Sequence, residues 1–221
     1  MFRDRKQAGQ QLGNELAKLA LKDPVVLALP PGGVLVAAEV AKILKAPFDL
    51  ILVQKVGAPK KPGLAVAALI DGNPPDIVLN REIVEACALA DDELRALIAD
   101  ERPQLETQRK SYRRKRPLLP IDGKTAILID DGAATGTTMK VAIRALRRRR
   151  PISILAALPV ASPDVVSLLA QEADRIVCLS QPVQGGGLDC HYVNFSQPSP
   201  AEIIAAADEM RARSTPWSKG S

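Results

Sequence analysis

Two adjacent carboxylates and a loop of small residues are the clearest candidates for chemistry in this chain. Asp130 and Asp131 follow the apolar run 126–129, which predicts a buried strand that ends just before them. The next seven residues, 132–138, are all glycine, alanine or threonine, and the apolar spacing beyond them predicts a helix. A strand, a small-residue loop and a helix in this order direct free backbone N–H groups and the positive end of a helix dipole at an anion.

The loop and the carboxylates together predict a sugar phosphate as ligand. Glycines allow the backbone to approach a phosphate closely, and threonine hydroxyls add hydrogen-bond donors. Carboxylates repel a phosphate, so we expect them to bind the hydroxyl groups of a diol, or a metal ion beside it. A ribose 5-phosphate has both parts. The predicted phosphate-binding residues are Gly132, Ala133, Ala134, Thr135, Gly136, Thr137 and Thr138.

An ATP-binding loop and an ordinary turn are the two alternatives for this segment. A Walker A loop would place a lysine directly after its last glycine, and no lysine follows Gly136. An ordinary strand–turn–helix connection would have a threonine as N-cap. Such a turn accounts for one threonine and one glycine, but not for an acidic pair beside a loop without large side chains.

Residues 127–138, ILIDDGAATGTT, resemble the phosphoribosyl-pyrophosphate (PRPP) signature of type I phosphoribosyltransferases. The resemblance implies that Asp130 and Asp131 hold the ribose 2- and 3-hydroxyls, with an indirect role at Mg²⁺, and that the loop binds the 5-phosphate. It also implies an α/β fold, a Rossmann-like parallel sheet flanked by helices with a small hood subdomain that carries a flexible loop. The run 192–197 also matches a bacterial group of mostly uncharacterised members, so the resemblance covers nearly the whole chain.

A second strand–glycine loop–helix unit precedes the signature. Residues 25–29 predict a strand, Pro31, Gly32 and Gly33 form the loop, and a helix is predicted over 34–44. The resemblance assigns this loop to pyrophosphate, although many relatives carry a basic residue where Pro31 stands. A plain turn between strand and helix is the alternative, because glycines are common in such turns.

Three lysines lie at or after the end of the next predicted strand, 49–55. Lys55 is the candidate for a second pyrophosphate contact. Lys60 and Lys61 lie in 56–63, whose composition predicts a flexible loop that closes over phosphates. For Lys60 and Lys61 a solvated loop without a role is an equal alternative.

Alternation of strands and helices predicts one parallel sheet with the candidate loops at the carboxyl ends of its strands. Besides the segments above, the pattern predicts strands at 64–70, 77–79, 152–160 and 175–179, and helices at 4–22, 80–88, 91–116, 163–170 and 200–213. Asp4 and Asp91 are the expected caps, and Pro103 is expected to kink or split its helix. We expect a single domain over 1–213, followed by a tail, 214–221. Its core covers about 23–56 and 120–180, and its hood and insertion about 57–119 and 180–197.

Composition limits the range of functions. A net charge of +5 and a pI near 9.2 in 221 residues suit an anionic small molecule and do not require nucleic acid. The basic runs 109–116 and 144–150 lack interleaved aromatics, so solvated helix faces, with Tyr112 packing inward in the first, are favoured over a polyanion site. Three cysteines without C-x-x-C spacing favour a reducing compartment over disulfides or zinc. With no signal peptide or membrane span evident, the expected location is cytoplasmic.

The resemblance of residues 127–138, together with the loop 31–33, implies a Mg²⁺-dependent phosphoribosyltransferase that acts on PRPP and a small, nitrogenous acceptor. A homodimer is one candidate assembly, and nucleic acid is not an expected partner. Ala134 stands where some purine-salvage relatives carry an aspartate that assists proton transfer. Ala134 and Pro31 therefore leave open a PRPP- or nucleotide-sensing protein without turnover. A third alternative is a hydrolase or phosphatase that uses Asp130 and Asp131 as a metal site. An aromatic residue of 180–197 could stack on a base, or this segment could be a hinge.

Overall fold

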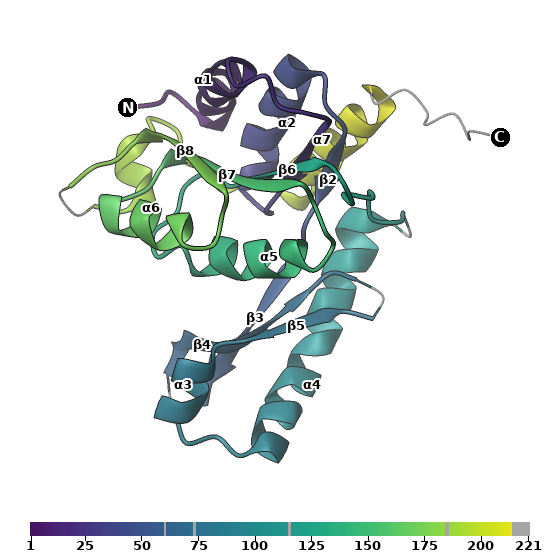
Figure 1. Ribbon diagram of the computed structural model, residues 1–221, viewed down its shortest axis with the longest axis vertical. Coiled ribbons are helices and arrows are strands. Elements are labelled where there is room, and N and C mark those ends of the chain that lie inside the picture. Colours follow the sequence, from purple (N-terminus) through teal and green to yellow (C-terminus); the bar gives the residue numbers. More distant parts are fainter. Residues whose placement is uncertain (60, 73, 115, 184–185, 214–221) are drawn as a thin grey trace.

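A five-stranded parallel sheet forms the centre of the protein (Figure 1). The computed structural model describes residues 1–59, 61–72, 74–114, 116–183 and 186–213. Every pairing in the sheet is parallel, which confirms the predicted α/β architecture. In spatial order the strands are β2 (Phe48–Leu50), β1 (Pro24–Ala28), β6 (Thr125–Ile129), β7 (Ser153–Val160) and β8 (Arg175–Ser180).

Helices cover both faces of this sheet. Helices α1 (Arg5–Ala17), α2 (Gly33–Leu44) and α7 (Pro200–Arg213) lie on one face, and α5 (Thr137–Arg147) and α6 (Pro163–Ala170) lie on the other. Successive strand residues point to opposite faces, so Ile127 joins the core beneath α1 and α2 while Leu128 joins the core beneath α5. Burial on both faces explains why β6 is apolar after its first residue, Thr125.

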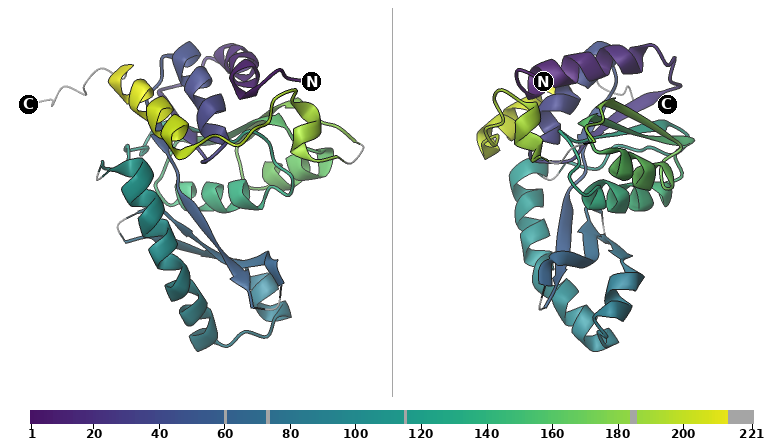
Figure 2. Two further views of the ribbon diagram at one scale, coloured as in Figure 1. Left: turned by 180° about the vertical axis from the view of Figure 1, so that it is seen from behind. Right: turned by 90° about the vertical axis from the view of Figure 1, so that its left-hand side faces the viewer.

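An antiparallel insertion stands beside the parallel sheet, below it in Figure 1 and seen from two further sides in Figure 2. It contains β3 (Val53–Ala58), β4 (Lys61–Ile70) and β5 (Asp76–Leu79), with α3 (Arg81–Ala86) and the long α4 (Asp91–Gln108). A π-helical turn, η1 (Arg109–Arg113), follows α4 directly. Residues 191–194 lie elsewhere, against the start of the chain, where Tyr192 forms a β-bridge with Phe2.

Two predictions for the insertion are wrong. The predicted strand 49–55 is divided, because the chain leaves the parallel sheet after Leu50 and enters the antiparallel sheet at Val53. The predicted loop 56–63 is largely strand, with Ala58 paired to Lys61. A continuous apolar run shows neither a change of sheet nor a hairpin, since both depend on partners elsewhere in the chain. Lys60 lies outside the described residues.

The helix predictions hold with three corrections. Asp4 caps α1, accepting a hydrogen bond from the Gln7 N–H at 2.8 Å, but the helix ends at Ala17 instead of residue 22. Helix α4 continues through Pro103 and is not split. Its N-cap is Ala90, whose N–H donates to Glu93 at 2.9 Å, so Asp91 is the first helical residue and not the cap.

A buried ion cluster joins the insertion to the core, and its centre is Arg113. This side chain, 3% exposed, donates to Asp71, pairs with Asp49 at 3.1 Å and donates to the carbonyl of Leu50 at 2.6 Å. The prediction of a solvated face over 109–116 is therefore wrong for Arg113. Its charge is neutralised inside the fold by Asp49, in the middle of β2, and by Asp71, directly after β4.

Arg109, partly exposed, also pairs with the buried Asp71, at 2.9 Å, so it departs from the prediction as well. Arg116 agrees with it, since its side chain is exposed and pairs with Asp208 of α7 at 2.8 Å, and Tyr112 is partly buried against the core. The cysteines Cys87, Cys178 and Cys190 are all free thiols. Over the part of the chain that the structure describes, no helix has the length and apolarity to cross a bilayer.

Candidate functional site

The two predicted loops meet at the carboxyl edge of the parallel sheet. Strands β1 and β6 are neighbours, with Ala28 paired to Ile129, so the turn after β1 lies beside the loop after β6. A Cβ atom added to Gly33 would lie 2.8 Å from the Ile129 carbonyl oxygen and 2.9 Å from the Asp130 Cα. The two loops therefore pack backbone against backbone, a separation that only glycine permits.

The loop after β6 presents unused donors at the start of α5. Among the described residues, the N–H groups of Ala134, Thr135 and Gly136 have no acceptor, and no side chain caps the helix. Hydroxyls of Thr135 and Thr137 lie 3.1 Å apart at the same place. Gly136 has φ +69°, a left-handed conformation that favours glycine. Free amides, hydroxyls and the helix dipole together make an anion-binding site.

The first two residues of this loop support it from behind. Gly132 and Ala133 are buried, and the Ala133 N–H is already used, donating to the Val160 carbonyl at 3.0 Å. A Cβ on Gly132 would lie 2.8 Å from Leu188. Ala134 and Thr135 are exposed, whereas Thr137 and Thr138 are partly exposed. The exposed part of the predicted phosphate loop is therefore its second half.

The turn after β1 offers a second set of donors. The N–H groups of Gly32, Gly33 and Val34 at the start of α2 have no acceptor within the described ranges. Pro31 has no N–H and contributes no donor. The edge of the sheet thus carries two helix N-termini side by side, with the acidic pair between them.

The two carboxylates lie in different environments. The Asp131 carboxylate accepts a hydrogen bond from Arg5 Nε at 2.7 Å, and the Tyr192 hydroxyl donates to the Asp131 carbonyl at 2.6 Å. Asp130 accepts from the Asp131 N–H at 2.9 Å. Burial raises the pKa of Asp130 well above its usual range, and the neighbouring Asp131 charge raises it further. A carboxylate with a strongly raised pKa is typical of functional sites.

The acidic pair fits a metal ion that keeps most of its own ligands. No cluster of three or more His, Cys, Asp or Glu side chains suited to a metal occurs in the described ranges. Asp130 and Asp131 supply two carboxylates, which is the protein share that Mg²⁺ uses when substrate phosphates and water complete its octahedron. The donor set therefore fits Mg²⁺ bound together with a phosphorylated substrate.

The predicted lysines lie on the insertion. Lys55 is on β3, exposed and opposite Ala68, and Lys61 begins β4 with an exposed side chain. Neither has a hydrogen bond or ion pair with the described residues of the two loops. Their proposed contacts with phosphates stay predictions.

Arg5 and Tyr192 are site residues that sequence reasoning missed. Arg5 begins α1, where a basic residue gives no signal of function. Tyr192 is 5% exposed and stacks with Phe195, so the prediction that an aromatic of 180–197 stacks on a base is wrong for Tyr192. Its ring packs between Phe2 and Phe195, and its hydroxyl fixes the Asp131 backbone through the hydrogen bond to the carbonyl.

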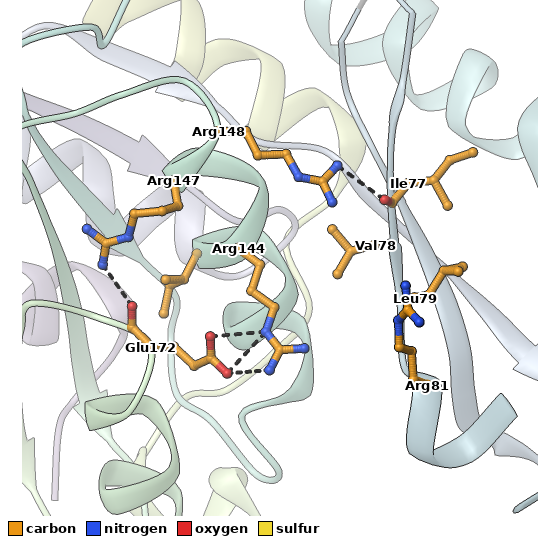
Figure 3. A pocket seen from close by; sticks show the side chains of 9 residues that line it. Ile77, Val78, Leu79, Arg81, Arg144, Arg147, Arg148 and Glu172 are labelled. Carbon is orange, nitrogen blue, oxygen red and sulfur yellow. Dashed lines mark hydrogen bonds and ion pairs between the residues drawn. The ribbon is translucent and has the colours of Figure 1, made fainter. Parts of the chain in front are cut away.

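A groove of about 480 Å³ between α5 and β5 is lined by arginines from α5 and α3 (Figure 3). Arg144 donates to the Glu172 carboxylate at 3.0 and 2.5 Å, and Arg147 donates to the Glu172 carbonyl at 2.9 Å. Arg148 donates to the carbonyl of Ile77 at 3.3 Å. Most of this charge is therefore paired within the protein. The prediction of a solvated face over 144–150 is wrong for Arg149, whose side chain is largely buried and donates to the Asp71 carbonyl at 2.5 Å.

Comparison with known proteins agrees with this geometry. A family model described as phosphoribosyl transferase domain matches residues 5–192, a range that contains both helix N-termini and the acidic pair. The chain belongs to the phosphoribosyl transferase domain family. The match begins at Arg5 and ends at Tyr192, the two residues that hold Asp131.

Named relatives and solved structures extend this family assignment. A Mycobacterium tuberculosis H37Rv protein, provisionally named a phosphoribosyl transferase, is 41% identical over 211 residues, which cover 94% of this chain and 46% of that protein. The chain thus spans about half the length of the curated relatives it matches. The crystal structure of TT1426 from Thermus thermophilus has a TM-score of 0.84 at 38% identity, covering 95% of this chain and 98% of that one. The AQ2163 protein from Aquifex aeolicus shares the fold, with a TM-score of 0.50 at 13% identity over 79% of this chain and 72% of the other.

Proposed function

We propose that this domain binds PRPP with Mg²⁺ and transfers the 5-phosphoribosyl group to a small nitrogenous acceptor, releasing pyrophosphate. One observation carries the proposal: two helix N-termini with unused amide donors flank an acidic pair at one sheet edge. A molecule with phosphates at both ends and a diol in its middle complements that order of charges. PRPP has this arrangement.

Binding follows from the donors available on each loop. The amides of Ala134, Thr135 and Gly136, together with the threonine hydroxyls, hold the 5-phosphate. Asp130 and Asp131 accept hydrogen bonds from the ribose hydroxyls. A phosphate group could not replace the ribose there, because an ionised phosphate has no hydrogen to donate. The amides of Gly32 and Gly33 hold the pyrophosphate at the start of α2. The ribose is thereby fixed between two anion sites, and this orientation lowers the entropic part of the barrier.

The transfer breaks the bond between the anomeric carbon and a pyrophosphate oxygen and forms a bond from that carbon to the acceptor nitrogen, which releases its proton to the departing pyrophosphate or to water. Positive charge develops on the ribose as the bond breaks, and the neighbouring carboxylates stabilise it electrostatically. Bound Mg²⁺ supplies neutralisation of the departing pyrophosphate. Lys55 and Lys61 are candidates to reach that anion by movement of the β3–β4 hairpin, which would also exclude water from the reactive ribose.

The test is titration calorimetry of PRPP with Mg²⁺ on the wild type and on the Asp130→Asn/Asp131→Asn double variant. We expect binding to the wild type and at least a roughly tenfold weaker affinity for the variant, because both charged acceptors for the diol are lost. Equal binding by the two proteins, or no binding by either, would contradict the proposal.

A second assay separates catalysis from sensing, since Ala134 and Pro31 favour the alternative of a regulatory PRPP-binding protein. Pyrophosphate release is followed across a panel of purines, pyrimidines and amines. Release that depends on one acceptor supports transfer, release without an acceptor indicates a hydrolase, and binding with no release under any condition indicates a sensor.

A further inference from the structure

Arg5 is a buried charge that neither sequence pattern nor fold requires. It is 4% exposed and lies at the first position of α1, where a cationic side chain opposes the helix dipole. Its Nη2 atom is buried and has no hydrogen-bond partner in the described part of the structure. A buried arginine with an unused donor costs stability, so its retention needs a compensating reason.

Arg5 connects Asp131 with Phe195 and Ser196, which lie more than 60 residues further along the chain. Its Nε donates to the Asp131 carboxylate at 2.7 Å, its Nη1 donates to the Ser196 carbonyl at 2.8 Å, and its guanidinium lies 4.0 Å from the Phe195 ring. The aromatic face holds the planar guanidinium by stacking, which lysine does not reproduce.

The segments around Arg5 are themselves pinned together. We call residues 2–5 and 191–196 the terminal clasp. The Phe2 N–H donates to the His191 carbonyl at 2.8 Å, the Val193 N–H donates to the Phe2 carbonyl at 2.8 Å, and the Asn194 N–H donates to the Arg3 carbonyl at 2.9 Å. Because both sides of the guanidinium are fixed by this clasp, Arg5 has one orientation, and that orientation faces Asp131.

Gly32 lies beside the hydrogen bond between Arg5 and Asp131, against the same carboxylate oxygen. A Cβ atom on Gly32 would overlap Asp131 Oδ2 and lie 2.9 Å from Arg5 Nε. Arg5, Asp131 and the turn after β1 thus form one packed unit across the acidic pair. Arg5 therefore restrains the Asp131 carboxylate to its present position, and displacement of the carboxylate breaks this hydrogen bond.

We propose that Arg5 is a positioning residue that holds the Asp131 carboxylate ready for the ribose hydroxyls and so determines affinity for the ribose part of the substrate. The inference rests on the proposed function, because it assigns Asp131 to the diol. Arg5 itself touches no substrate in this scheme. Its polar contact with the site is the one to Asp131, so its loss should weaken ribose-containing ligands much more than free pyrophosphate, which binds backbone amides of the turn after β1.

The experiment measures calorimetric affinities for PRPP, ribose 5-phosphate and pyrophosphate, each with Mg²⁺, and thermal unfolding of every protein. The variants are Arg5→Gln, Arg5→Lys and the matched control Arg3→Gln, an exposed arginine two residues away that pairs with Asp4. We expect Arg5→Gln to weaken PRPP and ribose 5-phosphate by about 10- to 100-fold and pyrophosphate by less than about threefold. Arg5→Lys, which keeps the charge, recovers part of that loss, and Arg3→Gln binds as the wild type does.

Several results would overturn the inference. Unchanged ribose 5-phosphate affinity in a folded Arg5→Gln variant would exclude positioning of the diol. Equal loss for pyrophosphate would show a general collapse of the site, and a folded Arg5→Lys variant no better than Arg5→Gln would exclude the charge contact. If Arg5→Gln does not fold, Arg5→Lys compared with the wild type decides by the same contrast between ribose 5-phosphate and pyrophosphate. Failure of wild-type protein to bind PRPP would instead contradict the proposed function.

Discussion

Replacement of Gly32 by alanine should separate binding from stability at the site. The backbone of Gly32 is right-handed helical, with φ −71° and ψ −37°, so alanine is tolerated conformationally. The new methyl group would overlap the Asp131 carboxylate oxygen, which is the free end of a side chain and can rotate away. We therefore expect a moderate loss in the free energy of unfolding, roughly 1–2 kcal/mol, because the buried Arg5 gives up one hydrogen bond while the fold is otherwise kept.

The effect on ligand binding should exceed this loss of stability. To regain van der Waals contact, the carboxylate must move by on the order of 1 Å, and it leaves Arg5 Nε in doing so. Misplacement of a positioned group by about 1 Å can cost about 100-fold, which corresponds to about 2.7 kcal/mol. We expect PRPP affinity of Gly32→Ala to fall by about this factor.

The assay is calorimetry with PRPP and Mg²⁺, paired with urea unfolding. Gly186→Ala is the control, since an added Cβ there meets Cys190 at 3.5 Å, an ordinary contact. A folded Gly32→Ala protein that binds PRPP within about threefold of the wild type would refute the reasoning, because the crowded contact would then not constrain Asp131. Loss of binding by Gly186→Ala would show that the effect is not specific.

Three further outcomes follow from the structure. In the ligand-free protein the raised pKa of Asp130 contributes stability that is fully present at a pH below the pKa of an unfolded carboxyl, and this contribution is lost as pH rises through the raised pKa. Urea unfolding at several pH values should therefore show a decline in the free energy of unfolding for the wild type and a flatter profile for Asp130→Asn. Arg113→Met should lower the free energy of unfolding by about 3–5 kcal/mol because it leaves Asp49 and Asp71 buried with fewer partners, whereas Arg116→Ala, at the exposed pair with Asp208, should lower it by about 0–1 kcal/mol. Similar losses for the two variants in urea unfolding would contradict the role of burial. Gly136→Ala should lower the free energy of unfolding by about 1–2 kcal/mol, because residue 136 has a left-handed φ of +69°, and it should weaken ribose 5-phosphate binding. A variant that matches the wild type in both unfolding and calorimetric binding would show that the left-handed turn is not required.

The sequence by itself determined the core and the two loops of the site. Strand β6 is a run of apolar residues between polar ends, and the loop after it has no side chain larger than threonine, so strand, loop and helix α5 follow from local preference. Because parallel strands place such loops at one edge, the meeting of 31–33 with 130–138 was predictable without coordinates.

Tertiary structure alone decided what holds and isolates the acidic pair. Arg5 reaches Asp131 across 126 positions, and Tyr192 reaches it across 61, separations over which no local pattern carries information. The same is true of Arg113, whose run of neighbouring charges resembles a solvated face until Asp49 and Asp71 enclose it. A charged side chain is placed by the partner that offsets its desolvation, and that partner is chosen by the fold and not by the adjacent sequence.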